Sequence, residues 1–305
     1  MLPNMETDVK FKIIQAGGLL LILFVALMAG CNHEDYPGQT DEGHIENFIL
    51  NEDKGVDLFR ATNIFPQTPY HWPGNDTLYY DSVMSVNREF DTYISDSSWD
   101  YGALGWLYEG VSRVSDIFQV RRFGIMGTDT TFIDESRTLV RAGFFLKLGR
   151  DIDYNFGWDL WGMGYFNQNP TEMNVGLWFA DSTSMRGGFD LYSQRLIDNN
   201  LTGGGQYREL VNFKVIPDSS ECRIDVEISN PSIPKRYYTR VSYPVEDGYA
   251  SLLLTQIDQE HATGTVMLGE HPVPAYDFVV ISLYDPATKE FVRAWTAPYR
   301  INPIT

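Results

Sequence analysis

The chain has 305 residues, a formal net charge of −18 and only two cysteines, Cys31 and Cys222. A chain this acidic is repelled by nucleic acid and by anionic lipid head groups, so we expect no nucleic-acid partner. Its length suffices for one large domain or two ordinary ones, each with a full hydrophobic core.

The N-terminus has the pattern of an export signal. Two lysines, Lys10 and Lys12, precede an uncharged run over residues 15–30. That run is short for a bilayer span, which takes about 20 apolar residues. We therefore expect residues 1–30 to be a signal peptide that is removed.

The end of this run, Met28-Ala29-Gly30-Cys31, resembles the lipobox of bacterial lipoproteins, with Met28 in place of the commoner leucine. In that family the cysteine is acylated and becomes the first residue of the mature protein. The resemblance implies lipidation at Cys31, attachment to a membrane through the N-terminal lipid, and a place in the cell envelope. Two or more acyl chains are enough for stable anchoring.

The residues after Cys31 bear on which membrane holds the protein. Asn32 stands where an aspartate would favour the inner membrane in such lipoproteins, so the outer membrane is expected. Residues 32–53 contain seven carboxylates and no lysine or arginine. This run resembles the surface-export signal of Bacteroidota lipoproteins, and a self-repelling linker has the same composition. The periplasmic or surface side of the membrane therefore stays open.

Residues 31–75 are predicted to be an acidic tether with a short helix and a Pro-rich loop. Apolar residues recur at helical spacing over 44–61, but Gly55 interrupts them, so one helix or two short turns fit the pattern. The Pro-rich passage over 65–74 is expected to lie as a loop over the body.

Residues 76–202 are predicted to form an aromatic-rich β domain. Its expected strands cover 77–86, 89–94, 140–148, 155–166 and 173–180, with a break at Asn87-Arg88. In the fourth strand the large side chains change parity near Gly162. Either both faces of that strand are covered, or a β-bulge flips its phase.

The run Gly203–Gly205 is the predicted domain boundary. Residues 206–305 hold seven short strand candidates, and residues 217–220 and 285–289 read as hairpin turns. The candidates cover 207–216, 221–229, 236–243, 249–257, 262–268, 276–284 and 290–296. The predicted fold is mainly β: an antiparallel β-sandwich or barrel-like domain followed by an immunoglobulin-like β-sandwich.

Few residues suggest chemistry. Cys222 alternates with apolar neighbours and is expected to be buried. Asp151-x-Asp153-x-Asn155 imitates a calcium loop, but the positions that need glycine and glutamate hold Phe156 and Gly162. We expect no catalytic residue, no metal and no cofactor.

The strongest binding candidates are Trp158, Trp161 and Trp178, which fall on neighbouring predicted strands. Such aromatic residues stack on sugar rings, line a small apolar cavity, or fill a β core. The expected function is that of a structural or protein-interaction module on the envelope. The alternative is a module that binds a glycan or a small apolar ligand through these tryptophans. Other envelope proteins or glycans are the expected partners.

Overall fold

The computed structural model describes residues 40–61, 64–65, 68–151, 153–164, 173–179, 196–198, 206–210, 213, 215–217, 220–228, 237–246, 248–258, 260–268 and 276–302. For residues 173–179, 196–198, 206–209, 217, 220, 228 and 302, only the backbone is described. Residues from Asp41 onward form one compact unit. Within these ranges no helix has the length and apolar character needed to cross a membrane.

Two short helices begin the unit, α2 (Asp41–Asn51) and α3 (Asp53–Phe59). The chain changes direction at Glu52, whose backbone is extended, so the break lies three residues before Gly55. Gly55 instead sits where the two helices meet, because a Cβ there would overlap the backbone of Phe48 and Ile49. The periodic pattern, predicted as one helix or two short turns, thus forms two short helices.

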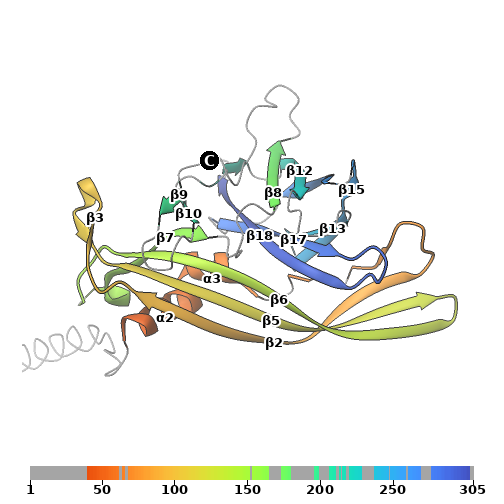
Figure 1. The fold of residues 1–305 in the computed structure, drawn as a ribbon, viewed down its shortest axis with the longest axis horizontal. Coiled ribbons are helices and arrows are strands. Elements are labelled where there is room, and N and C mark those ends of the chain that lie inside the picture. The colour runs from red at the N-terminus through yellow and green to blue at the C-terminus, as the bar shows by residue number, and fades with distance from the viewer. Residues whose placement is uncertain are drawn as a thin grey trace, which may run out of the picture. The chain divides into compact units, whose positions relative to one another are not determined.

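The largest sheet has seven strands in the order β1-β2-β5-β6-β7-β10-β9, all antiparallel. Three of them, β2, β5 and β6, are very long and form the base of the molecule (Figure 1). The strands are β1 (Tyr70–His71), β2 (Leu78–Ile94), β5 (Glu109–Met126), β6 (Asp129–Lys147), β7 (Trp158–Gly164), β9 (Leu196–Asp198) and β10 (Gln206–Glu209). A two-stranded hairpin, β3 (Trp99–Asp100) and β4 (Trp106–Leu107), and the 3₁₀ turns η1 (Gly102–Leu104) and η2 (Tyr154–Gly157) complete this part.

Two further sheets pack on it. One has five strands in the order β11-β18-β17-β13-β14, and the other has four in the order β15-β16-β12-β8. Only the β11–β18 pair is parallel among the described strand pairs. The bounds are β8 (Met173–Phe179), β11 (Val215–Pro217), β12 (Ser220–Ile228), β13 (Tyr238–Val245), β14 (Gly248–Leu253), β15 (Thr255–Gln256), β16 (His261–Leu268), β17 (Tyr276–Tyr284) and β18 (Phe291–Asn302).

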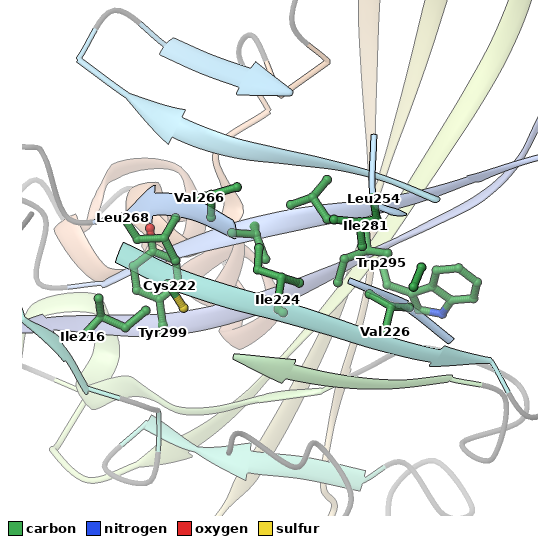
Figure 2. Packing of buried hydrophobic residues seen from close by; sticks show 14 of the residues in the cluster. Ile216, Cys222, Ile224, Val226, Leu254, Val266, Leu268, Ile281, Trp295 and Tyr299 are labelled. Atoms are coloured by element: carbon green, nitrogen blue, oxygen red, sulfur yellow. The ribbon is translucent and has the colours of Figure 1, made fainter. Parts of the chain in front are cut away.

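The five-stranded sheet is the middle layer of the stack. One of its faces packs on the four-stranded sheet around Cys222, Ile281 and Trp295 (Figure 2). Its other face, through Phe278 and Val280, packs on the seven-stranded sheet. Because both faces of β17 are covered, all of its residues except the first are buried. The mainly β, sandwich-like fold is thus confirmed, as is the burial of Cys222.

The strand prediction for residues 77–94 was wrong in one respect. Asn87-Arg88 does not separate two strands, because β2 continues through both residues and pairs with β5 as far as Ile94. Arg88 points into the protein, where its guanidinium pairs with Asp116. A charged residue that suggested a loop is instead an inward-facing part of a strand.

The strands on either side of the predicted domain boundary share sheets. Strand β10 pairs with β7, and β12 pairs with β8, so each of these two sheets combines strands from before and after residues 203–205. Residues 203–205 themselves lie outside the described residues. The turn predicted at 285–289 joins β17 to β18 as a hairpin. The one predicted at 217–220 is not a hairpin, since β11 and β12 belong to different sheets.

Candidate functional site

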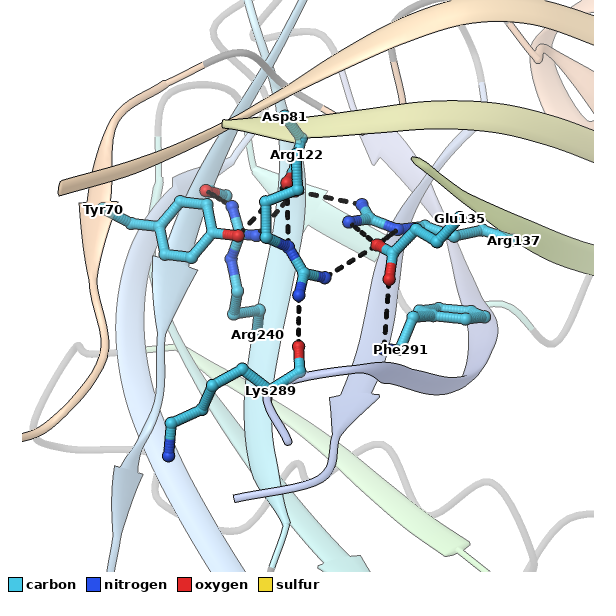
Figure 3. Close-up of polar contacts among 9 residues, drawn as sticks. Tyr70, Asp81, Arg122, Glu135, Arg137, Arg240, Lys289 and Phe291 are labelled. Atoms are coloured by element: carbon cyan, nitrogen blue, oxygen red, sulfur yellow. Dashed lines mark hydrogen bonds and ion pairs between the residues drawn. The ribbon is translucent and has the colours of Figure 1, made fainter. Parts of the chain in front are cut away.

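The most unusual feature of the interior is a group of charged side chains between the seven- and five-stranded sheets. We call it the Asp81 cluster; it comprises Tyr70, Asp81, Arg122, Glu135, Arg137 and Arg240 (Figure 3). Asp81 Oδ2 accepts hydrogen bonds from Arg137 Nη1 and Arg240 Nη1, both at 3.0 Å. Its Oδ1 accepts from the Tyr70 hydroxyl at 3.1 Å and from Arg122 Nε at 3.4 Å. Every hydrogen-bonding position of this carboxylate is therefore occupied.

Strand register explains how these residues meet. Asp81 and Arg122 are direct partners across β2 and β5, so their side chains share a face of the sheet. Glu135 and Arg137 are two residues apart on β6 and share that same face. Glu135 Oε1 accepts from Arg122 Nη2 and Arg137 Nε, each at 2.7 Å. Arg240 reaches the group from β13, so the cluster joins the two sheets.

Electrostatics keeps Asp81 ionised. Burial alone raises the pKa of Asp81, but the charges of Arg137 and Arg240 outweigh it and hold that pKa well below its ordinary value. Three guanidinium groups face two carboxylates, which leaves one positive charge in excess. A cation–π contact partly stabilises this excess charge, because Arg240 Cζ lies 3.6 Å from the ring centre of Tyr70.

A second charged cluster fixes the helices to the sheet. Asp116 is completely buried and pairs with Arg88, at 2.6 Å, and with Arg141. Arg141 also donates to the backbone carbonyls of Leu58, Phe59 and Arg60, at 3.1, 3.0 and 2.9 Å. These are carbonyls at the C-terminal end of α3, where a helix lacks partners and favours a positive charge. Arg141 thus replaces a conventional helix cap.

A third contact joins α3 to the five-stranded sheet. Arg60 Nη2 donates to the buried Asp277 at 2.6 Å and to the Tyr249 hydroxyl at 3.0 Å. Nearby, burial raises the pKa of Asp57 to about 6; Arg60 opposes this shift, and Asp277 adds to it.

These clusters are suited to holding layers together rather than to catalysis. The Asp81 carboxylate is held by guanidinium groups whose charges keep its pKa low, so it is not poised to exchange a proton. In the part of the chain that is described, no three His, Cys, Asp or Glu side chains are arranged to bind a metal ion. The sequence alone does not reveal the clusters, because the partners of each charge lie on other strands.

The three candidate tryptophans do not form one surface. Trp158 is 3% exposed, packs under the helices, and donates from Nε1 to Asp41 at 3.0 Å. Trp161 packs on the opposite face of the sheet, against a cluster that includes Phe144. Trp178 lies on β8 opposite Arg223, but its side chain is outside the described residues, as is Cys31.

A β-bulge separates Trp158 from Trp161. Phe144 pairs with Gly162 and Phe145 with Leu160, which leaves Trp161 as the extra residue. Leu160 and Met163 consequently pack in the same cluster although they are three residues apart. The change of parity predicted near Gly162 is therefore a bulge.

The segment with Asp151, Asp153 and Asn155, before β7, contains a turn and the 3₁₀ turn η2. Asp151 pairs with Lys147 at 2.6 Å, and Asp153 accepts from the backbone nitrogen of Arg150, also at 2.6 Å. Asn155 accepts from Asn47 Nδ2 at 3.1 Å. These contacts give each side chain a separate structural role.

Two exposed apolar regions lie at opposite ends of the long sheet. One is the β3–β4 hairpin, residues 95–108, at the end of the sheet where α2 begins; the other is the β5–β6 arm, residues 121–134 (Figure 1). From Gly110 to Met126 the strand rises by about 50 Å. Neither region was identified from the sequence, because their apolar residues look like core.

Comparison with known proteins gives no assignment: no protein-family model matches the chain, and no curated protein matches its sequence.

Proposed function

We propose that this chain is a lipid-anchored cell-envelope protein, attached through Cys31 to a membrane, that acts as a structural or protein-interaction module. The observation that carries the interaction role is the β5–β6 arm. Met126, Phe132 and Ile133 are each more than half exposed there. Large apolar side chains gathered on a protruding element are typical of a protein contact site.

The arm projects past the sheet that packs on it. Arg122 donates to the backbone carbonyl of Lys289, in the β17–β18 turn, so residues 123–132 continue beyond that turn. Phe132 pairs with Phe123, and Ile133 pairs with Arg122, so the two apolar residues of β6 point to opposite faces. A partner that contacts both residues would therefore bind both faces of the arm.

The buried clusters support this role by making the base of the arm stiff. Arg122 and Glu135 belong to the Asp81 cluster and stand at the point where the arm leaves the body. Because the arm is already rigid, it loses little conformational entropy when a partner binds. The arrangement favours a module that presents a fixed surface over one that encloses a ligand.

The alternative role in glycan or apolar-ligand binding loses its proposed platform. Trp158 and Trp161 lie on opposite faces of the sheet, and Trp158 is covered by the helices. A shared stacking surface would need both rings on one exposed face.

The interaction role is tested by a pulldown from solubilised envelopes with the wild type and the double variant Met126→Ser, Phe132→Ser. Ile257→Ser is the matched control, since Ile257 is 64% exposed but lies between β15 and β16. We expect the arm variant to lose a partner that the wild type and the control retain. Equal recovery by all three proteins would contradict the role of the arm.

The anchor is tested separately. Cys31→Ser should move the protein from the membrane fraction to the soluble fraction, because the acyl chains supply the attachment. The intact mass of the mature wild type should show lipid on an N-terminal residue 31. An unmodified Cys31 in the mature protein would refute the lipoprotein interpretation.

A further inference from the structure

The β3–β4 hairpin exposes an unusual set of side chains. Leu104 is 48% exposed and Trp106 is 71% exposed, while Trp99 and Tyr108 are each between a third and a half exposed. Asp100 pairs with Trp106 across the hairpin, and Trp99 pairs with Leu107. Leu107 packs against the sheet, so Trp106 lies on the side that faces away from it.

The hairpin is a well-formed element. Gly102 and Gly105 have φ angles of 64° and 83°, which favour glycine, and they let the chain turn tightly. The Tyr101 backbone nitrogen donates to the Gly105 carbonyl at 2.8 Å. The Tyr101 hydroxyl donates at 2.7 Å to Glu109, a buried residue of β5. The backbone that carries the exposed side chains is thus held in place.

This hairpin is rooted beside the point where the described chain begins. The Lys147 backbone nitrogen donates to the Tyr108 carbonyl at 3.1 Å, and the Lys147 ammonium donates to Asp41 at 3.1 Å. Asp41 is the first residue of α2. Asp41 is ten positions after Cys31 in the chain, a distance of at most about 35 Å for an extended chain. A lipid on Cys31 therefore keeps this end of the molecule near the bilayer.

We propose that the β3–β4 hairpin inserts Leu104 and Trp106 into the interfacial layer of the membrane to which the chain is anchored. The inference rests on the proposed lipid anchor. Tryptophan and tyrosine favour the level of the lipid head groups, where an apolar ring and a polar N–H or O–H are both accommodated. The chain carries a net charge of −18, so the contact is apolar and suits zwitterionic rather than anionic phospholipid.

Such a contact gives the anchor an orientation. A lipid on a linker limits only how far the body can move from the bilayer. A second, rigid contact through the β3–β4 hairpin also fixes the tilt of the body. With the hairpin on the bilayer, the β5–β6 arm at the other end of the sheet points away from it. The two exposed apolar regions then serve different surfaces.

The test uses the chain from residue 31 with Cys31→Ser and an N-terminal histidine tag, bound to phosphatidylcholine vesicles that contain a nickel-chelating lipid. An environment-sensitive nitrobenzoxadiazole dye is attached at Leu104→Cys or, as the matched control, at Met126→Cys. Cys222 is buried and does not compete for the label. We expect a several-fold rise in emission with a blue shift at position 104 and no change at position 126. Adding Trp106→Ser should reduce the rise at position 104.

The same response at both positions, or none at position 104, would overturn the proposal. A response at position 104 to soluble oligosaccharides without vesicles would also overturn it and would identify the aromatic side chains as a glycan platform. Because the tag replaces the acyl chains, the result is independent of whether Cys31 is lipidated in the cell. Failure here and failure of the lipoprotein interpretation are therefore distinguishable.

Discussion

Replacing Asp81 with asparagine tests whether the buried charges hold the sheets together. The carboxylate accepts hydrogen bonds from three guanidinium groups and Tyr70, and an asparagine amide of the same shape keeps one oxygen and loses the charge. The excess charge of the cluster then rises from one to two. Removing one partner from a buried ion pair typically destabilises a protein by about 3–5 kcal/mol. For a domain of this size, that corresponds to a fall in melting temperature of roughly 10 °C.

Thermal melting followed by circular dichroism measures this effect, with Asp134→Asn as the control. Asp134 also forms an ion pair with an arginine, Arg121 at 2.6 Å, but it lies on the exposed face of the arm. We expect the control to melt close to the wild type, because solvent screens surface pairs. Adding Arg240→Met to Asp81→Asn should recover part of the loss, since it removes the second unpaired charge. If Asp81→Asn and the control have the same melting temperature, the Asp81 cluster does not hold the two sheets together.

The pH dependence has a definite sign. The pKa of Asp81 is lowered in the folded protein, so its stabilisation is complete above the unfolded pKa of about 4 and is lost as the pH falls below it. Acid unfolding of Asp81→Asn should therefore be less steep below pH 4 than that of the wild type. An identical acid transition would show that Asp81 is not held by the three arginines.

Three further predictions concern other parts of the fold. Burial raises the pKa of Asp57 to about 6, so its charge destabilises the protein above that pH; Asp57→Asn should raise the melting temperature at pH 7.5 and leave it unchanged near pH 4, and a loss at pH 7.5 would count against this. Gly55→Ala should lower the melting temperature, because the new methyl group overlaps the backbone of α2, and an unchanged melt would show that the helices separate easily. Cys222 should resist alkylation in the native protein and react once unfolded, whereas rapid native labelling would place it outside the core.

Local patterns predicted the parts of the fold that depend on alternation. Cys222, Ile224 and Val226 are buried on one side of β12, as their spacing indicates. The parity change near Gly162 is a bulge, and the interrupted helical pattern gives two helices. In each case the signal lies within about ten residues, and the side chains that point inward are apolar.

The long strands were harder to predict because their inner face is charged. In β5 the buried positions include Asp116 and Arg122, so the alternation that identifies a strand is hidden. Arg88, a charged residue that faces inward, likewise led to the prediction of a break within β2. Each charge is stabilised by a partner on another strand, and a single sequence does not show which strand that is. The pairing of β8 with β12 joins strands far apart in the sequence, and local alternation does not show which strands pair.

The central claim, that the chain presents the β5–β6 arm to another envelope protein, is tested most directly by site-specific cross-linking in intact envelopes. A photoreactive benzophenone amino acid replaces Phe132 in one variant and Ile257 in the other, both exposed apolar positions. The account predicts one reproducible cross-linked species at position 132 that is missing at position 257 and is lost when Met126→Ser is added. Identical cross-linking at the two positions, or none at position 132, would contradict it.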